Sequence, residues 1–298
     1  MKEVHTLGDL ESWRELAPPD RPPIRLGVFG EPVAHSRSPE MQNAALATCG
    51  FDMQYARFEI ARDELPRAME LVRELNFVGL NLTIPHKAAG IELVDEVDEF
   101  ARAVGTINSV RLEQGRLSGF NTDGPGFRAA INSEFETDLA GLRILLFGAG
   151  GGAGRAIATQ CARGGCERVT LVNRTAAKAQ QLAQYLHATS GTLVEAVAWN
   201  QRELHAAIAE ADLLVNATSV GLLPTDTLLI PADALHAELM VYDTVYASTP
   251  TALLWAARNA GARTANGLSM LLHQGALAFE TWFGREAPLR EMAAALGL

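Results

Sequence analysis

From Ile24 onward, short apolar segments alternate with longer segments that have the character of helices. Residues 24–30 are apolar and predict a buried strand. Ser38 and Pro39 then predict the start of a helix, with Ser38 as N-cap, and Gly50 predicts its end. We expect this half of the chain to continue with a helix over about 62–75, a strand over 77–82, and two strands within 105–121 joined at Gln114-Gly115.

A second alternating series begins near Asp123. Its strands are expected at 143–147, 169–172, 193–198, 213–216 and 240–243, with one helix ending near Arg163 and another starting near Thr175. Apolar strands separated by helices of this length indicate a parallel sheet with right-handed crossovers. From Leu268 the chain has a helical pattern again, and this segment is expected to return to the first series.

The pattern predicts an α/β fold with two domains, since 298 residues exceed what one hydrophobic core usually holds. Residues 1–23 end in a proline-rich patch, so we expect them to be an N-terminal extension. We expect an N-terminal α/β domain formed by 24–122 and 268–298, and a doubly wound Rossmann-type domain formed by 123–267.

Composition narrows the class of protein. The net charge of -10 and the pI near 5.2 argue against a nucleic-acid partner, which needs a basic surface. The three cysteines, Cys49, Cys161 and Cys166, have no metal-ligand spacing and predict free thiols in a reducing compartment. The charged N-terminus resembles no signal peptide, and no apolar stretch is long enough to span a bilayer. We therefore expect a cytoplasmic protein without a membrane partner.

A glycine-rich turn predicts a dinucleotide site. It follows the strand 143–147, opens a helix and fits the spacing G-x-G-x-x-A, in which missing side chains let the backbone approach a pyrophosphate. A structural turn without a ligand is the alternative. The residues of the turn are Gly148, Ala149, Gly150, Gly151, Gly152 and Ala153.

The end of the next strand indicates which dinucleotide binds. It carries Asn173, Arg174 and Thr175, with Lys178 one turn later, and it lacks the carboxylate that binds the ribose 2′-hydroxyl of NAD. Two cations at a helix start suit the 2′-phosphate of NADP. A solvated arginine beside an asparagine cap is the alternative, and NADP is the expected cofactor.

Polar residues gather at strand ends outside that unit. Ser36 and Ser38 precede a helix and could hold a carboxylate, although Ser38 could equally be a simple N-cap. Lys87 follows a strand that ends among polar residues, which distinguishes it from an ordinary solvated lysine. Asp123 lies in a polar run between glycines, and a helix N-cap is the alternative for it.

Taken in order, these segments resemble the shikimate dehydrogenase family from about Ile24 to the C-terminus. The motifs that carry the resemblance are Ser-Arg-Ser-Pro at 36–39, Asn-Leu-Thr-Ile-Pro-His-Lys at 81–87, Gly-Thr-Ile-Asn at 105–108, Gly-Phe-Asn-Thr-Asp at 119–123, the glycine turn at 148–153, Asn-Arg-Thr at 173–175, Asn-Ala-Thr-Ser-Val-Gly at 216–221, Asp-Thr-Val-Tyr at 243–246 with Thr-Pro at 249–250, and 267–274.

The resemblance implies a substrate-binding and catalytic first domain and an NADP-binding second domain. The implied reaction is the reversible reduction of 3-dehydroshikimate to shikimate by NADPH, in the pathway to chorismate and aromatic amino acids. Lys87 and Asp123 would be the catalytic pair, because the ketone oxygen gains negative charge as hydride arrives and needs a proton donor.

The resemblance also implies the remaining site residues. Ser36 and Ser38 would hold the substrate carboxylate with Tyr246 nearby. The ring hydroxyls and the reacting oxygen would meet Thr83, Lys87, Asn108, Asp123 and Gln274. The 2′-phosphate would meet Asn173, Arg174 and Thr175, and Thr218, Ser219 and Gly267 would lie near the rest of the cofactor.

Three departures from the family pattern are visible. Lys178 stands where the family usually has arginine, one extra residue precedes Arg155 in the glycine turn, and Thr244 replaces a common methionine. A quinate/shikimate dehydrogenase that accepts NAD is the main alternative, an aminoshikimate variant ranks below it, and a non-catalytic binding paralogue is a third possibility. The seven scattered histidines predict no metal site, and we expect a monomer or a homodimer.

Overall fold

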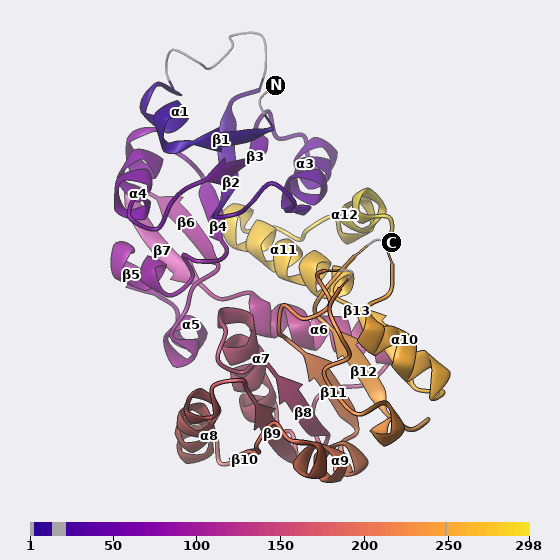
Figure 1. Cartoon of the computed structure of the whole chain (residues 1–298). Helices are drawn as coiled ribbons and strands as arrows, with labels where there is room; N and C mark the ends of the chain where they lie inside the picture. Colours follow the sequence, from indigo (N-terminus) through magenta and orange to yellow (C-terminus); the bar gives the residue numbers. More distant parts are fainter. Residues whose placement is uncertain (1–2, 14–21, 224, 248) are drawn as a thin grey trace. The chain divides into compact units, whose positions relative to one another are not determined.

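The computed structural model describes residues 3–13, 22–223, 225–247 and 249–298 (Figure 1). The chain divides into two compact units. Unit 1 comprises Met1–Thr122 and Leu272–Leu298, and unit 2 comprises Asp123–Leu271. Unit 1 is thus discontinuous in sequence, and unit 2 is inserted into it.

The second boundary between the units falls inside a helix, α11 (Leu268–Phe283), rather than at its start. The first turn of α11 is bonded to unit 2, because the Tyr242 hydroxyl lies 3.0 Å from Ser269 Oγ and accepts from Met270 N–H at 3.0 Å. The rest of the helix belongs to unit 1.

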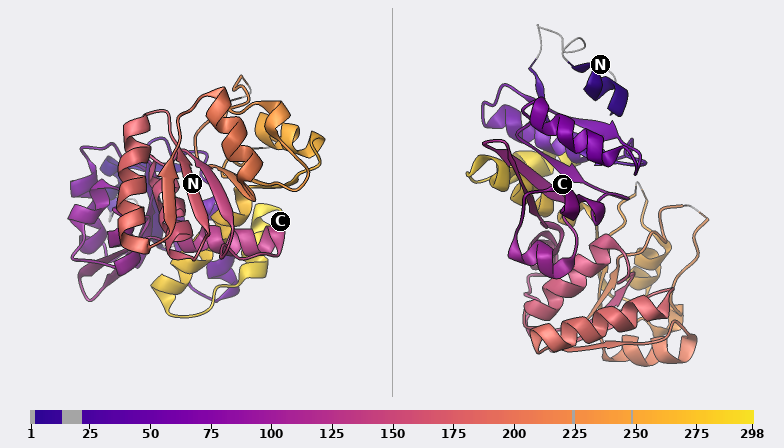
Figure 2. Two further views of the ribbon diagram at one scale, coloured as in Figure 1. Left: turned by 90° about the horizontal axis from the view of Figure 1, so that it is seen from below. Right: turned by 90° about the vertical axis from the view of Figure 1, so that its left-hand side faces the viewer.

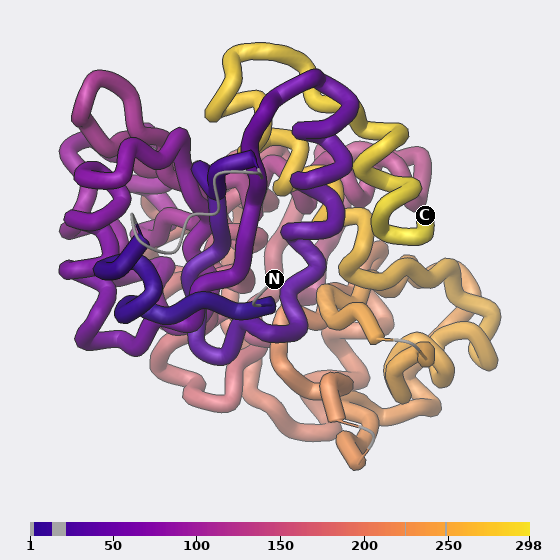
Figure 3. The backbone as a smooth tube through the Cα atoms, turned by 90° about the horizontal axis from the view of Figure 1, so that it is seen from above, coloured from indigo at the N-terminus to yellow at the C-terminus, as the bar shows by residue number. Residues whose placement is uncertain are grey.

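The expectation that residues 1–23 form an extension is wrong for the part that the structure describes. Strand β1 (Val4–Thr6), the indigo segment next to the N label in Figure 3, pairs in parallel with β3 (Gln54–Glu59). Leu10 of the following helix is completely buried. A strand of three residues is too short to leave a periodic signal, which explains why the sequence did not predict it. Pro18 and Pro19 of the proline-rich patch lie outside the described residues.

Among the described residues, unit 1 holds a seven-stranded sheet in the order β1-β3-β2-β4-β6-β7-β5. The four strands from β1 to β4 are parallel, β4, β6 and β7 are antiparallel neighbours, and β5 pairs in parallel with β7. The expected hairpin turn is confirmed, since Gln114 and Gly115 both have positive φ, as a two-residue hairpin requires. The other elements of unit 1 are β2 (Ile24–Gly30), β4 (Gly79–Leu82), β5 (Glu96–Val97), β6 (Ser109–Glu113), β7 (Arg116–Phe120), α1 (Leu7–Glu11), α3 (Ser38–Thr48), α4 (Leu65–Glu74), the 3-10 helix η1 (Ala89–Leu93), α5 (Glu99–Val104) and α12 (Leu289–Leu296).

The C-terminal segment packs into the core of unit 1. Trp282 of α11 donates through its indole nitrogen to the carbonyl of Val110 at 3.0 Å. It also fills the space beside Gly79, where an added Cβ would lie only 2.4 Å from the indole ring. Helix α12 packs on α3, so the two sequence segments that form unit 1 pack together.

Unit 2 contains, in the part of the chain that the structure describes, a six-stranded parallel sheet in the order β10-β9-β8-β11-β12-β13. Counted from β8, this is the order 3-2-1-4-5-6 of the doubly wound dinucleotide-binding fold. The predicted α/β fold class is therefore confirmed. The elements of unit 2 are α6 (Asp123–Phe135), β8 (Arg143–Phe147), α7 (Gly152–Arg163), β9 (Arg168–Val172), α8 (Ala176–Ser190), β10 (Leu193–Ala196), α9 (Gln201–Glu210), β11 (Leu213–Asn216), the 3-10 helix η2 (Ala232–Ala234), β12 (Met240–Asp243), α10 (Ala252–Asn259) and β13 (Arg263–Asn266).

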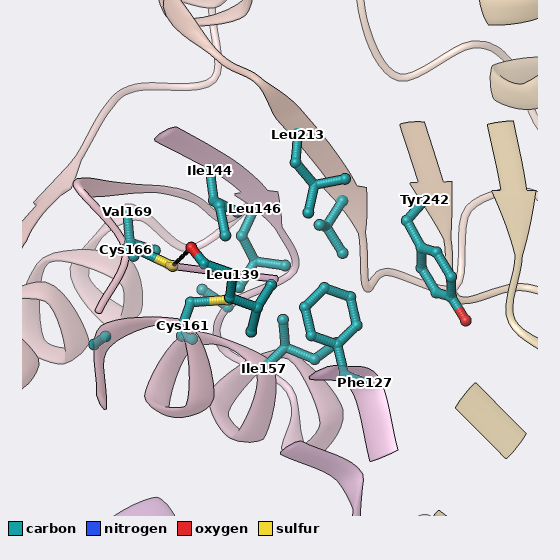
Figure 4. Close-up of a cluster of buried hydrophobic side chains, with 14 of the residues drawn as sticks. Phe127, Leu139, Ile144, Leu146, Ile157, Cys161, Cys166, Val169, Leu213 and Tyr242 are labelled. Carbon is teal, nitrogen blue, oxygen red and sulfur yellow. Dashed lines mark hydrogen bonds between the residues drawn. The ribbon is translucent and has the colours of Figure 1, made fainter. Parts of the chain in front are cut away.

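Helices cover both faces of this sheet (Figure 2, left). Successive side chains of a strand point to opposite faces. Leu146 of β8 accordingly joins a core with Ile157 of α7, whereas Leu145 joins a second core with Leu204 of α9. Figure 4 shows the first core, where the Cys166 thiol lies 3.1 Å from the carbonyl of Leu139.

Several predicted boundaries shift by a few residues. The helix expected over 62–75 spans Leu65–Glu74, and the strand expected over 193–198 ends at Ala196. The strand expected from 77 begins at Gly79, because Phe77 N–H is still bonded to the carbonyl of Val72 at the end of α4.

Candidate active site

The candidate substrate site lies where β2 and β4 end in unit 1. These neighbouring strands lie where the chain direction across the sheet reverses, which is the usual position of a ligand crevice in open α/β sheets. The segments that follow them are bonded together, since Glu31 N–H donates to the carbonyl of Ile84 at 2.9 Å. Thr83 packs against Gly30, where an added Cβ would lie 2.3 Å from the Thr83 methyl group.

Ser36 and Ser38 are linked to each other just before α3. Ser38 N–H donates to Ser36 Oγ at 3.3 Å, and Ser38 is 7% exposed while Ser36 is half-buried. The N-cap of α3 is Arg37 rather than Ser38, which is already the first helical residue, and the helix ends at Thr48 before Gly50. The expectation that Ser38 caps the helix is therefore wrong by one residue.

A buried tyrosine extends from the serines into the sheet. The Tyr55 hydroxyl of β3 donates to Asn81 Oδ1 at 2.7 Å, and Asn81 Nδ2 donates to the carbonyl of Asn108 at 3.0 Å. Burial raises the pKa of Tyr55 well above its usual value, which a hydrogen bond with Ser38 partly opposes. Tyr55 therefore stays protonated and links Ser38 with Asn108 through Asn81.

Asn108, Thr122 and Gln274 converge at the other side of this group. Asn108 Oδ1 accepts from Thr122 N–H at 2.7 Å, and Asn108 Nδ2 donates to Thr122 Oγ1 at 3.0 Å and to Gln274 Oε1 at 3.3 Å. Residues at the two ends of the β6–β7 hairpin and one residue of α11 thus present amide and hydroxyl groups together. Asn108 and Gln274, both expected to bind the substrate, are therefore hydrogen-bonded neighbours in the structure.

In the sequence, Lys87 precedes Asn108 and Asp123 directly follows Thr122. Lys87 lies half-buried in the turn after β4, and its backbone carbonyl accepts from Ile107 N–H at 2.9 Å. Asp123 is 4% exposed. It is the first residue of α6 rather than the residue before the helix.

His86 is a buried neighbour of Lys87 with a structural environment. Its Nε2 lies 2.8 Å from the carbonyl of Ile60, which can only accept, so Nε2 carries the proton. Its Nδ1 is buried without a hydrogen-bond partner among the described residues. Burial lowers the pKa of His86, and the hydrogen bond to Ile60 opposes that effect.

We expect acid to destabilise the wild-type protein more than a His86→Gln variant. Below the ordinary histidine pKa of about 6.5, the unfolded chain takes up a proton that folded His86 still excludes, so stability falls as the pH falls. The melting temperature of the wild type should drop between pH 7.5 and 5.5 by ~2–4 °C more than that of the variant, which is the effect of about 1 kcal/mol. Equal drops in the two proteins would contradict this expectation.

The glycine turn of unit 2, where a pyrophosphate is expected, packs closely against neighbouring backbone. Gly148 has φ +87°, and an added Cβ there would lie 2.6 Å from the backbone of Ala217. Gly150 N–H donates to Asn173 Oδ1 at 3.2 Å. An added Cβ on Gly154 would lie 2.2 Å from the carbonyl oxygen of Gly148, so this glycine lets α7 pack against the turn.

Gly154 therefore has the close-packing role that the spacing G-x-G-x-x-A assigns to Ala153. The extra residue before Arg155 moves this position by one, and the observed spacing is G-x-G-x-x-x-G. The signal was present in the sequence, because Gly154 is a glycine within an otherwise alanine-rich helix. Tyr55 and Thr122 were also absent from the predicted site residues.

The basic residues expected at the 2′-phosphate lie around the start of α8. Asn173 Nδ2 donates to the carbonyl of Thr175 at 3.0 Å, and Arg174, Thr175 and Lys178 are exposed. The Lys178 side chain approaches Gly150, where an added Cβ would lie 3.1 Å from Lys178 Cδ. The glycine turn and the basic residues thus adjoin within unit 2.

The ends of β11 and β12 carry further residues that are expected near the cofactor. Asn216 Oδ1 accepts from the Thr218 hydroxyl at 2.7 Å, and Asn216 Nδ2 donates to Asp243 Oδ1 at 2.8 Å. Burial raises the pKa of Asp243, although the hydroxyl of Thr251 donates to it at 2.6 Å. An added Cβ on Gly267 would lie 2.0 Å from the carbonyl oxygen of Thr244, so only glycine fits there.

Tyr246 and Asp123 belong to unit 2, and their predicted roles beside residues of unit 1 remain predictions. Within residues 3–13, 22–223, 225–247 and 249–298, no group of three or more His, Cys, Asp or Glu side chains could hold a metal ion. None of the helices formed by these residues combines the length and the apolar character needed to cross a bilayer.

Family models match most of the chain. The shikimate dehydrogenase substrate binding domain matches residues 28–110, the shikimate / quinate 5-dehydrogenase model matches 130–250, and the shikimate 5'-dehydrogenase C-terminal domain matches 267–296. A relative from Methanopyrus kandleri named shikimate dehydrogenase (NADP(+)) is 41% identical over 273 residues, covering 91% of this chain and 94% of the relative.

Solved structures agree with these matches. Shikimate 5-dehydrogenase from Listeria monocytogenes, in complex with shikimate and NAD, has a TM-score of 0.85 and 34% identity, covering 94% of this chain and 98% of its own. Shikimate 5-dehydrogenase from Thermus thermophilus, in complex with NADP(H) and shikimate, has a TM-score of 0.82 and 38% identity, covering 91% and 98% respectively.

Proposed function

Because the chain belongs to the shikimate dehydrogenase family, we propose that it interconverts 3-dehydroshikimate and shikimate. It is an oxidoreductase that acts on a CH–OH group and uses NADP. The observation that carries the proposal is the group of amide and hydroxyl side chains around Asn108, which suits a small polyhydroxylated ring. The same reaction belongs to the pathway toward chorismate and aromatic amino acids.

Lys87 and Asp123 would be the proton-transfer pair. Two backbone positions support this proposal, since Lys87 is bonded through its carbonyl to Ile107 and Asp123 follows Thr122, which is bonded to Asn108. When bound, NADPH supplies the hydride. Lys87 would then donate the proton to the ketone oxygen, and Asp123 would orient Lys87 and accept from the adjacent hydroxyl.

The choice of lysine at position 87 supports a role in proton transfer. The chain contains 25 lysines and arginines, and its lysines are Lys2, Lys87 and Lys178, so most of its cations are arginines. Arginine cannot lose its proton in proteins, whereas lysine can both donate and accept one when its surroundings allow. A reversible oxidoreduction needs a group that donates a proton during reduction and accepts one during oxidation, as lysine can.

The carboxylate of the substrate would bind at Ser36 and Ser38, with Tyr246 nearby. Ser36 Oγ already accepts from Ser38 N–H, so its own proton remains available for an anionic ligand. Thr83, Asn108 and Gln274 would bind the ring hydroxyls.

The pyrophosphate of NADP would lie on the glycine turn at the start of α7, where backbone N–H groups and missing side chains suit an anion. Arg174 and Lys178, with Asn173 and Thr175, would hold the 2′-phosphate. Thr218, Ser219 and Gly267 would lie along the rest of the cofactor. Arginine can bind a phosphate through two parallel hydrogen bonds, whereas Lys178 offers only a single charged group. We therefore propose a moderate rather than absolute preference for NADP over NAD.

Initial rates with shikimate and with quinate, each measured with NADP and with NAD, test the proposal. We expect kcat/KM to be highest for shikimate with NADP, because the 2′-phosphate meets cations and no carboxylate follows β9. A higher kcat/KM for quinate with NAD would favour the alternative, a quinate/shikimate dehydrogenase. Absence of turnover with all four pairs would favour a binding protein that has lost activity.

We further propose that the enzyme works in the cytoplasm, as a monomer or a homodimer. The support for the location is that Cys161 and Cys166 are buried free thiols, as is usual in a reducing compartment.

A further inference from the structure

Arg57 lies next to the two serines but belongs to a different element. It is on β3, two residues after Tyr55, and its side chain is only 17% exposed. Nothing in the sequence singles it out, because strand β3 carries no polar motif. Within the described residues, the hydrogen bonds of its guanidinium group nevertheless go to Ser36 and Glu40, on either side of Ser38.

The guanidinium group makes a forked contact with one backbone carbonyl. Arg57 Nε donates to the carbonyl oxygen of Ser36 at 2.9 Å, and Arg57 Nη2 donates to the same oxygen at 2.6 Å. Arg57 Nη2 also lies 2.6 Å from Glu40 Oε1 in the first turn of α3. One side chain thus joins the last loop residues before α3 to the first turn of the helix.

This contact fixes the orientation of a peptide group. In a trans peptide the C=O and N–H groups point in opposite directions, so holding the Ser36 carbonyl toward Arg57 turns the Arg37 N–H away from it. The same geometry holds Ser36 where its Oγ accepts from Ser38 N–H at 3.3 Å. The Ser36 hydroxyl proton then remains available for a ligand.

The charge of Arg57 is largely neutralised where it lies. Glu40 forms an ion pair with it, and the remaining donors of the fork meet the Ser36 carbonyl. A long-range attraction between Arg57 and an anionic substrate is therefore a weaker explanation of this arrangement than the orientation of the serine segment.

We propose that Arg57 is a positioning residue for the substrate carboxylate, and that it acts through the Ser36 carbonyl rather than through its charge. This inference rests on the proposed role of Ser36 and Ser38. Loss of the fork leaves the Ser36–Arg37 peptide free to turn, which removes the preset geometry of the hydroxyl donors. Chemistry at the ring carbon does not depend on this contact.

Steady-state kinetics of Arg57→Met with shikimate and with its methyl ester test the proposal. We expect KM for shikimate to rise about tenfold, the usual weight of one hydrogen bond to a charged group, with kcat and KM for NADP within about twofold of wild type. The ester lacks the anionic carboxylate. The ratio of kcat/KM for shikimate to that for the ester should therefore fall about tenfold in the variant.

Arg73→Met is the matched control. Arg73 also bridges a carboxylate and a backbone carbonyl in unit 1, with Nη1 at 2.8 Å from Asp95 and at 2.7 Å from the carbonyl of Gly115. Its removal should leave the shikimate-to-ester ratio unchanged. An equal change in the ratio for both variants, or an equal rise of KM for acid and ester in Arg57→Met, would overturn the proposal.

Glu40→Gln separates orientation from charge. If Arg57 acts through the Ser36 carbonyl, removal of the Glu40 charge should change KM for shikimate by less than about threefold. A tenfold fall in KM would instead mean that the freed charge attracts the substrate, and it would contradict the positioning role.

Arg57→Lys covers the case in which Arg57→Met does not fold. It keeps the charge but loses the fork, so KM should still rise, and an unchanged KM and ratio would overturn the proposal. Wild-type turnover of shikimate is measured in the same series. If the wild type does not turn over shikimate, the proposed function is refuted. If the wild type is active and the Arg57 variants keep its KM and its shikimate-to-ester ratio, only this inference is refuted.

Discussion

Lys87→Ala is expected to lower turnover of shikimate by ~10²–10⁴-fold, the usual weight of one general acid-base group, with little change in KM. Without the amine, the negative charge that develops on the ketone oxygen during reduction has no proton donor at this position. Steady-state kinetics with NADPH and 3-dehydroshikimate measure the effect. A rate near that of the wild type would show that Lys87 is not the proton donor.

Lys87→Arg distinguishes proton transfer from charge. Arginine keeps the positive charge but cannot give up its proton at neutral pH, so this variant should be nearly as inactive as Lys87→Ala. The same replacement at Lys178 is the control, since that position needs only a cation beside a phosphate. Lys178→Arg should keep turnover within a few-fold of wild type, and high activity of Lys87→Arg would favour a purely electrostatic role.

Gly154→Ala is expected to raise KM for NADP by roughly 10–100-fold, because overpacking of this kind typically costs about 1–3 kcal/mol. The added methyl group would lie 2.2 Å from the carbonyl oxygen of Gly148, so either the turn or the start of α7 must move. Initial rates at varied NADP, with the melting temperature measured in parallel, give the effect.

Gly151→Ala is the informative comparison for Gly154→Ala. The nearest atom to an added Cβ at Gly151 is also the Gly148 carbonyl oxygen, but at 3.6 Å, which is an ordinary contact. We expect a clearly smaller rise in KM for NADP. Equal effects of the two substitutions would mean that close packing at Gly154 is not what shapes the turn.

The strands whose bounds could be predicted to the residue lie in the interior of a sheet, between two neighbouring strands. The interior strands β8, β11 and β12 have the same bounds in sequence and structure, because continuous apolar segments leave a clear signal. The edge strands β1, β5 and β13 were missed, and so was β3, which lies between β1 and β2. A strand of three residues carries no period, and the residues Arg-Thr-Ala-Asn of β13 have no apolar run.

The residues of the candidate site also differ in whether they leave a local signal in the sequence. Ser36, Lys87 and Asn108 could be named as candidates from the sequence, because polar residues beside the end of an apolar strand stand out. Tyr55 and Arg57 lie inside a strand, where only the register with β2 and the position of α3 bring them to the serines. Such contacts depend on tertiary structure and leave no local pattern.

The discontinuity of unit 1 has a consequence for biosynthesis. As the chain leaves the ribosome, the strands of unit 1 emerge first, but Trp282 and the helix that packs on α3 emerge last. Unit 2 is continuous and can fold as soon as Leu271 is clear of the exit tunnel. The inserted unit 2 is therefore expected to fold before unit 1. Until the C-terminal helices have been synthesised, the apolar face of the unit 1 strands remains uncovered.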